Sequence, residues 1–271
     1  MVVAALRQLF GQTIALEGKR IVFVGGLQRS GTSPLYKALL AVPGRTGIYG
    51  THVPEQEGQF LQSVYEPDKS FGILYGFERD CYLSERDTFD PERDRLRLLA
   101  DWGRFWSPKA DVFVEKTPSN IVRLPYLKAL FPEGEFIVIV RHPLAYSLAL
   151  KKWSDEPLRR IIEHWLMVHK TSIENLLKVD GVTVVRYEDI CDPSSGARSR
   201  LQQRHGVATS ADLFADQNVK YFETWGGLHL TALSNDDRIV LSNRYGQVES
   251  VFGYSLDEPY VLAEPQWMKE A

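Results

Sequence analysis

The residues with the clearest chemical potential lie in one short segment near the N-terminus. It runs from Val24 through Gly25-Gly26-Leu27-Gln28-Arg29-Ser30-Gly31-Thr32-Ser33. Glycines let the backbone approach an anion closely, the three hydroxyls can donate hydrogen bonds to it, and the Arg29 guanidinium offers a planar fork of donors for an oxyanion. The segment follows an apolar run and precedes a helical pattern, so the first N–H groups of that helix should point at the same anion. These residue types predict a phosphate-binding loop.

This loop departs from the one that nucleotide triphosphatases use. From Gly26 its spacing is G-x-x-x-x-G-T-S, whereas the triphosphatase loop has a lysine in place of the threonine. Thr32 occupies the lysine position here, and the cation, Arg29, lies inside the loop. We therefore expect a phosphate-like ligand, but a chemistry other than that of a P-loop kinase, which also needs a magnesium carboxylate.

Two further cations follow apolar runs later in the chain. Lys116 belongs to the segment Glu115-Lys116-Thr117-Pro118, and Arg141 ends the run 136–140 directly before His142-Pro143. The carboxyl ends of parallel strands meet at one edge of a sheet, where ligands bind in open α/β folds. Arg29, Lys116 and Arg141 should therefore face one crevice, which favours a multiply anionic ligand. We interpret His142 as a hydrogen-bonding residue at a helix start rather than as a catalyst.

The pattern of apolar residues predicts the elements that position these side chains. Four short β-branched runs, 21–24, 112–114, 136–140 and 182–185, are typical of buried parallel strands and are separated by helix-length segments. The longest helical pattern covers 158–179, and a second helix should begin after Asp90 and run through Trp102. The fold class that follows is α/β, with a P-loop-like central parallel sheet flanked by helices.

Length and composition favour one domain. The chain has 271 residues, of which 44% are apolar, so we expect a single domain over 1–271 with its core in 20–190. Segments 43–89 and 190–271 have weak periodicity, and we expect loops and small helices there over the sheet edge. The acceptor lid should span about 43–106 and the C-terminal lid about 190–271. Cys81 and Cys191 are expected to be reduced thiols of a cytoplasmic protein.

The same composition argues against several partners. The net charge of −3 gives no global attraction to nucleic acid. No apolar run approaches the roughly 20 residues that a membrane span requires. No cluster of His, Cys and Asp has metal-ligand spacing, so we expect no metal. The sequence does not predict an oligomeric state.

At this point the chain resembles the sulfotransferases that use 3′-phosphoadenosine 5′-phosphosulfate. Arg29-Ser30-Gly31-Thr32-Ser33 is similar to the 5′-phosphosulfate motif of that family, and Arg141-His142-Pro143 to its 3′-phosphate motif. Glu115–Pro118 resembles the lysine-containing segment between them, and Val185–Asp189 resembles an Arg-Tyr-Glu-Asp element after a later strand. The four segments occur in the family's order over about residues 20–190. Their pattern is closest to the tyrosylprotein-type and bacterial branch.

The resemblance implies a reaction and a set of binding residues. A sulfuryl group would pass, without a metal, from 3′-phosphoadenosine 5′-phosphosulfate to an acceptor hydroxyl, and adenosine 3′,5′-bisphosphate would remain. The acceptor stays open among a small alcohol or phenol, a carrier-tethered hydroxyacyl chain, a sugar and a tyrosine. Lys116 and Arg29 would stabilise the leaving group. The expected donor-binding residues are Gly26, Gln28, Arg29, Ser30, Gly31, Thr32, Ser33, Arg141, Ser147 and Tyr187.

Two positions depart from the family pattern. Many members bind the 3′-phosphate with a serine eight residues after the motif arginine, but that position is Ala149 here. Ser147 is two residues earlier, which on a helix is a rotation of about 200°, so either it lies in the preceding turn or other donors serve. The histidine that follows the lysine by two residues in the cytosolic enzymes is replaced by Pro118.

The missing histidine leaves the general base to be found elsewhere. The segment Thr51–Gln59 carries Glu57, Glu55 and His52 at the place where the tyrosylprotein branch has a Gly-Glu-Glu segment. Each of the three could deprotonate an acceptor hydroxyl. We favour Glu57 slightly, because Gly58 would let substrate and backbone approach.

Two points stay open at the level of sequence. Trp153, Trp165, Tyr187 and Trp225 are candidates to flank the adenine, although core packing is the expected role of each. The alternative functions are a P-loop nucleotide kinase and a non-catalytic nucleotide-binding module on the same fold. Affinity for adenosine 3′,5′-bisphosphate compared with ATP would separate these functions.

Overall fold

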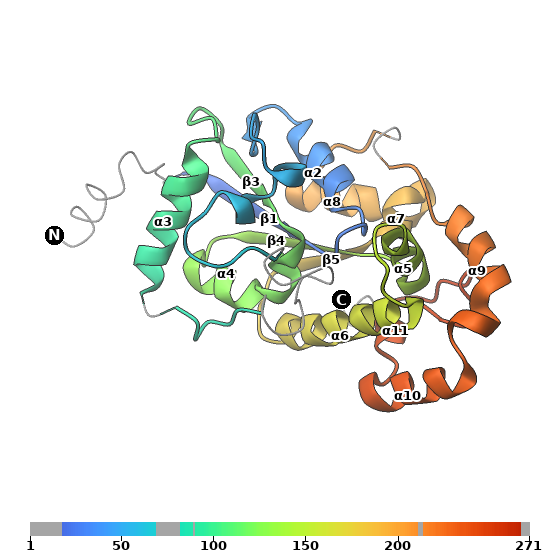
Figure 1. Cartoon of the computed structure of the whole chain (residues 1–271). Coiled ribbons are helices and arrows are strands. Elements are labelled where there is room, and N and C mark those ends of the chain that lie inside the picture. Colours follow the sequence, from blue (N-terminus) through green and yellow to red (C-terminus); the bar gives the residue numbers. More distant parts are fainter. Residues whose placement is uncertain (1–17, 69–81, 89, 211–213, 267–271) are drawn as a thin grey trace.

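The computed structural model describes residues 18–68, 82–88, 90–210 and 214–266. Within them, one parallel sheet of five strands has the order β2-β3-β1-β4-β5 (Figure 1). The strands are β1 (Arg20–Gly25), β2 (Arg45–Thr46), β3 (Val112–Lys116), β4 (Glu135–Val140) and β5 (Val182–Arg186). This confirms the predicted α/β fold with a central parallel sheet. The two-residue β2 was not predicted, because it contains no apolar run.

The register of the sheet brings the chemical segments to one edge. On β1, Val24 lies opposite Lys116 of β3 and Ile137 of β4. On the other side of β4, Val140 lies opposite Arg186 of β5. Strands β1 and β3 therefore end next to each other, at Gly25 and Lys116, and β4 and β5 end next to each other, at Val140 and Arg186. All four carboxyl ends lie at the same edge, as the sequence predicts for parallel strands.

Helices cover both faces of the sheet (Figure 1). Because side chains alternate along β1, Ile21 and Phe23 join one apolar cluster, with residues of α3, α4 and α6, while Val22 and Val24 join another, with residues of α2 and α8. The longer helices are α2 (Thr32–Leu40), α3 (Pro91–Gly103), α4 (Leu124–Leu130), α5 (Pro143–Lys151), α6 (Leu158–Leu176), α8 (Ala197–His205), α9 (Val219–Ala232) and α10 (Asn235–Tyr245); α7 (Tyr187–Cys191) and α11 (Val248–Val251) are short.

The two predicted helices are present with small differences. Helix α3 begins after Asp90, whose carboxylate accepts the backbone N–H of Arg93, as an N-cap should. Helix α6 ends at Leu176, three residues earlier than expected, because the Asn175 carbonyl accepts from the N–H groups of Lys178 and Val179 in a closing turn.

The C-terminal segment contributes to the core as well as to the sheet edge. Phe222, Trp225, Phe252 and Tyr254 are buried in the cluster that contains Phe23 and α6. Among the described helices, none combines the length and the apolar character that a bilayer crossing requires.

Of the two cysteines, Cys191 is a free thiol and Cys81 lies outside the described residues. Burial raises the pKa of the Cys191 thiol to about 11. At neutral pH this thiol is therefore protonated, which suits a structural residue rather than a nucleophile.

Candidate active site

The predicted phosphate-binding loop connects β1 to α2 and is pressed against its neighbours. A Cβ on Gly26 would lie 2.3 Å from the Ile139 carbonyl oxygen, and a Cβ on Gly31 would lie 2.7 Å from the Tyr187 ring. Both glycines also have positive φ angles, 146° and 100°. Only glycine satisfies both conditions, so the loop conformation depends on these two residues. Gly31 is the N-cap residue of α2, which leaves the first N–H groups of the helix directed outward.

Several buried polar atoms around this loop have no partner among the described residues. They are both side-chain amide atoms of Gln28, Oγ of Ser30, Nη2 of Arg141 and Oγ of Ser147. Burying such a group without a hydrogen bond costs about 1–3 kcal/mol. Similar atoms occur elsewhere, for example on α6, but these four residues all belong to the predicted donor-binding set. Their chemistry fits an anionic ligand held at the N-terminus of α2.

Arg141 is fixed beside the loop in one orientation. Its Nη1 donates to the Arg29 carbonyl over 2.7 Å, and its Nε donates to Oδ1 of Asn218 over 2.8 Å. The guanidinium lies 4.5 Å from the centre of the Tyr187 ring. Nη2 is the nitrogen left for a ligand. The structure thus brings together Arg29, Arg141 and Tyr187, three members of the expected donor-binding set.

A buried carboxylate, Glu188, accepts hydrogen bonds from residues around Arg141 and so fixes their positions. It accepts hydrogen bonds from Asn218 Nδ2 at 2.5 Å, from the His142 N–H at 3.0 Å and from the Tyr254 hydroxyl at 2.6 Å. Burial raises the pKa of Glu188, and these donors oppose that shift. Asn218 and Tyr254 come from the C-terminal segment, so this segment helps to orient the anion site.

His142 has the structural role that the sequence predicts for it. Its Nδ1 accepts the Leu144 N–H at the start of α5, and its Nε2 lies 3.1 Å from the Ser255 carbonyl and donates to it. Burial lowers the pKa of His142 to about 3. The imidazole therefore stays neutral and caps the helix.

Lys116 and Glu57 form a buried ion pair at the end of β3. The Lys116 ammonium lies 3.2 Å from Glu57 Oε1, and only 1% of the lysine side chain is exposed. Glu57 Oε2 accepts from Gln59 Nε2 over 2.8 Å. Burial raises the pKa of Glu57, while Lys116 lowers it. The structure thus joins two of the predicted catalytic residues, which are 59 positions apart in the chain.

Glu115, the neighbour of Lys116, is a site residue that the sequence analysis missed. This fully buried carboxylate accepts from Thr117 Oγ1 at 2.5 Å, from Asn120 Nδ2 at 2.6 Å and from the Gly58 N–H at 3.1 Å. It therefore fixes the backbone directly after Glu57. The available signal was an acidic residue inside an apolar strand, with hydroxyl and amide side chains two and five residues later.

Glu55 and His52 lie in different surroundings from Glu57. Glu55 is exposed, has a φ angle of 51°, and accepts a hydrogen bond from the Ser33 hydroxyl over 3.1 Å. His52 is exposed to solvent. Glu55 therefore reaches the start of α2, whereas Glu57 reaches the lysine of β3.

The reason given above for preferring Glu57 is not supported by the position of Gly58. This glycine is buried, and a Cβ on it would lie 2.5 Å from Glu115 Oε1 and 2.9 Å from Trp102 Nε1. The absence of a side chain therefore accommodates Glu115 and Trp102 rather than a substrate. Contact with Lys116 is the observation that now favours Glu57.

Ser147 lies within α5, which begins at Pro143, and not in the preceding turn. The departure at Ala149 therefore calls for other donors as well. Lys152 and Lys220 approach the ring of Tyr221 to 4.9 and 5.2 Å from its centre, and Arg141 approaches the same ring to 5.4 Å. Three cations thus surround one ring next to the loop. The sequence analysis missed both lysines because nothing local distinguishes them from surface residues.

The expected core role holds for three of the four aromatic candidates. Trp165, Tyr187 and Trp225 are buried. Trp153 is 67% exposed, and the guanidinium of Arg29 lies 5.1 Å from the centre of its ring. The expectation of core packing was therefore wrong for Trp153, whose free face lies beside the loop.

Comparisons with known proteins add a family match. A model described as "Sulfotransferase family" matches residues 22–211. Similar solved structures include the sulfotransferase domain of the Synechococcus olefin synthase, with 19% identity, a TM-score of 0.47 and coverage of 84% of this chain and 95% of that chain. A sulfotransferase from Alicyclobacillus acidocaldarius has 14% identity and a TM-score of 0.44, with 84% and 96% covered. One from Mycobacterium avium has 16% identity and a TM-score of 0.48, with 94% and 82% covered. No curated protein matches significantly.

Replacing Gly58 with alanine should destabilise the protein. The added Cβ would press on Glu115 and Trp102, and overpacking of this kind costs about 1–3 kcal/mol. Urea unfolding of Gly58→Ala measures the loss. Gly181→Ala is the control, since Gly181 has a positive φ of 80° and no atom within 4 Å of its Cβ position; it should show backbone strain only. An unfolding free energy of Gly58→Ala equal to that of the wild type would contradict the close packing described here.

Proposed function

The chain belongs to the sulfotransferase family, and we propose that it transfers a sulfuryl group from 3′-phosphoadenosine 5′-phosphosulfate to the hydroxyl of an acceptor. The observation that carries this proposal is the group of buried polar atoms without a partner among the described residues, which belong to Gln28 and Ser30 of the loop and to Arg141 and Ser147 of the β4–α5 segment. A ligand with anionic groups at two points would satisfy donors in the loop and on the β4–α5 segment together.

The two halves of the site suit the two ends of such a donor. The loop offers the side chains of Arg29, Ser30, Thr32 and Ser33 and the N–H groups of α2 to the 5′-phosphosulfate. Arg141 would bind the 3′-phosphate, with Lys152 and Lys220 supplying hydrogen-bond donors in place of the serine that many relatives have at the position of Ala149. The exposed face of Trp153 is the surface left for the adenine ring.

The catalytic roles follow from the ion pair at the end of β3. When bound, the donor supplies the sulfuryl group and departs as adenosine 3′,5′-bisphosphate. Glu57 would take the proton of the acceptor hydroxyl as the new O–S bond forms. Lys116 would stabilise the electron pair that stays on the phosphate oxygen as the old S–O bond breaks. Lys116 lowers the pKa of Glu57, so a shift of the ammonium toward the leaving group would make Glu57 a stronger base.

The protein should bind adenosine 3′,5′-bisphosphate about tenfold to a hundredfold more tightly than AMP, and should bind ATP weakly. The reason is that the 3′-phosphate adds charged hydrogen bonds worth about 1.5–3 kcal/mol at Arg141. Calorimetric titration with the three nucleotides measures this preference. Equal affinity for AMP and the bisphosphate would refute the role of Arg141, and tighter binding of ATP would favour a kinase.

Arg29→Ala and Lys116→Ala should affect different kinetic quantities. Arg29 would contact donor and product alike, so its loss should weaken nucleotide binding by roughly 1.5–3 kcal/mol. Lys116 would act on charge that develops during transfer, so its loss should lower the single-turnover rate more than the donor affinity. Lys109→Ala, an exposed lysine at the opposite edge of the sheet, is the control. A Lys116 variant with weak donor binding and an unchanged transfer rate would reverse the assignment.

Glu57→Gln should lower the transfer rate by about 10²–10⁴, the share that a positioned base supplies. Glu55→Gln and His52→Asn should cost less, since neither residue contacts Lys116. Burial raises the pKa of Glu57 above its ordinary value of 4.5, and a base acts only when deprotonated. The wild-type rate should therefore rise with pH through this raised pKa, and the rise should disappear in Glu57→Gln. A full rate for Glu57→Gln would move the role to Glu55 or His52.

A further inference from the structure

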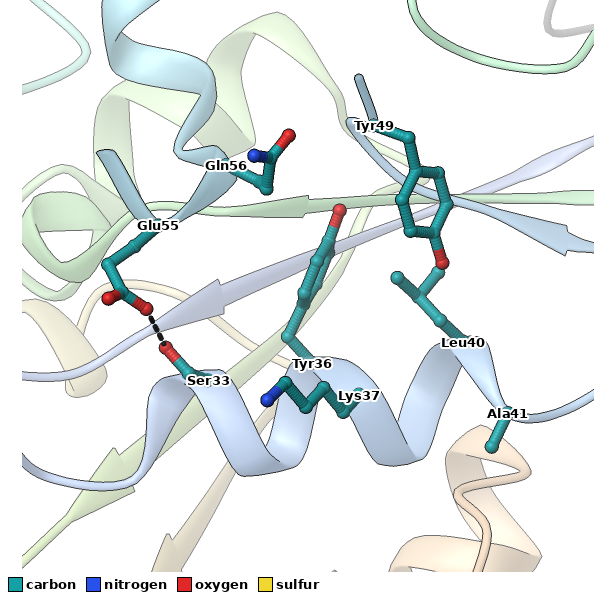
Figure 2. Close-up of a pocket in the computed structure, with 8 residues that line it drawn as sticks. All are labelled: Ser33, Tyr36, Lys37, Leu40, Ala41, Tyr49, Glu55 and Gln56. Atoms are coloured by element: carbon teal, nitrogen blue, oxygen red, sulfur yellow. Dashed lines mark hydrogen bonds between the residues drawn. The ribbon is translucent and has the colours of Figure 1, made fainter. Parts of the chain in front are cut away.

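A pocket of about 410 Å³ lies along one face of α2, next to the phosphate-binding loop. Figure 2 shows its two walls, one from α2 and one from the segment 49–56. The helix residues recur at three- and four-residue steps, so they form a single face. The lining residues are Ser33, Tyr36, Lys37, Leu40, Ala41, Tyr49, Glu55 and Gln56.

The middle of the pocket is apolar and its walls are fixed. The hydroxyl of Tyr36 accepts the Ile48 N–H over 2.7 Å, which ties the helix to the start of the opposite wall. Tyr49 is 55% exposed, although it is a large aromatic residue. Burial raises the pKa of both phenols, so they stay neutral. In Figure 2 the rings of Tyr36 and Tyr49 border the same space.

One end of the pocket meets the proposed reaction centre. Ser33 belongs to the phosphate-binding loop and donates to the Glu55 carboxylate over 3.1 Å, as the dashed line in Figure 2 marks. Glu55 and Gln56 are held there in left-handed conformations, with φ angles of 51° and 55°. Conformations of this kind cost free energy and gather at functional sites. The next residue, Glu57, contacts Lys116.

Lys37 lies further along the helix and places a positive charge on the lining. Its side chain is exposed, and no described residue pairs with its ammonium group. The lining therefore has two charged side chains. Glu55 accepts a hydrogen bond from Ser33, and Lys37 is available to pair with an acidic group of a ligand. In Figure 2 the Lys37 side chain runs back along α2 toward Ser33, so a ligand that lies along this face of the helix would have the ammonium group beside it.

We propose that this pocket binds the acceptor, and that the acceptor is a small hydroxylated aromatic molecule that also carries an acidic group. The proposal rests on the proposed function. The volume lies in the range of about 300–1,000 Å³ that is typical of small-molecule sites. The hydroxyl would lie at the end of the pocket where residues 55–56 lead to Glu57, the proposed base, with the aromatic body against Tyr36 and Tyr49 and the acid at Lys37.

The probes are 3-(4-hydroxyphenyl)propanoate and its neutral amide, titrated by calorimetry into the wild type, Lys37→Glu, Tyr49→Ala and the control Lys109→Glu. Each titration is run with and without saturating adenosine 3′,5′-bisphosphate. Lys37→Glu should weaken binding of the acid by about fivefold to tenfold, because an attraction becomes a repulsion. The same substitution should leave the affinity for the amide unchanged. Tyr49→Ala should lower the affinity for both probes, and Lys109→Glu should change the affinity for neither.

The outcomes separate this proposal from the proposed function. No binding of either probe to the wild type, or binding that neither Lys37→Glu nor Tyr49→Ala changes, overturns the pocket as the acceptor site. Probe binding that depends on both residues, in a protein that does not bind the bisphosphate, supports the ligand class and refutes the sulfotransferase function. In turnover assays, Lys37→Glu should raise KM for the acid and leave KM for the donor unchanged.

Discussion

The site depends on one buried charge, the carboxylate of Glu115 at the end of β3. A carboxylate without water needs several hydrogen-bond donors, because burial otherwise costs more than folding can offset. Its donors are Thr117, Asn120 and the backbone of Gly58. Asn120 Nδ2 also donates to the Val24 carbonyl at the start of the phosphate-binding loop. Satisfying one charge therefore aligns β3, the loop after β1 and the segment that carries Glu57.

A second buried carboxylate does the same for the other half of the site. Glu188 connects Asn218 and Tyr254 of the C-terminal segment with the start of α5, and Asn218 in turn orients Arg141. The orientation of Arg141 therefore depends on the packing of the C-terminal segment. Tyr221, from the same C-terminal segment, has its ring 5.4 Å from the Arg141 guanidinium.

The pairing of Lys116 with Glu57 follows from the same requirement. Neither group is solvated, so each is stabilised chiefly by the other and, for Glu57, by Gln59. A cation and a base held in contact can exchange partners when a negative charge develops nearby. The apolar pocket begins on the other side of the same short segment, at Glu55. One stretch of three residues thus faces the proposed donor site and the proposed acceptor site.

The sequence by itself determined the parallel sheet, the glycine-rich loop between β1 and α2 and the positions of Lys116 and Arg141 at one edge. These features depend on local patterns, namely apolar runs, glycine spacing and residues that directly follow strands. Only the tertiary structure decided that Glu57, and not Glu55, contacts Lys116. It also decided that Glu115 fixes the segment next to Glu57, that Glu188 fixes the residues around Arg141, and that a pocket lies along α2. The reason is physical: two left-handed residues turn neighbouring carboxylates to different surroundings, and the hydrogen bonds that fix them join segments more than 50 residues apart.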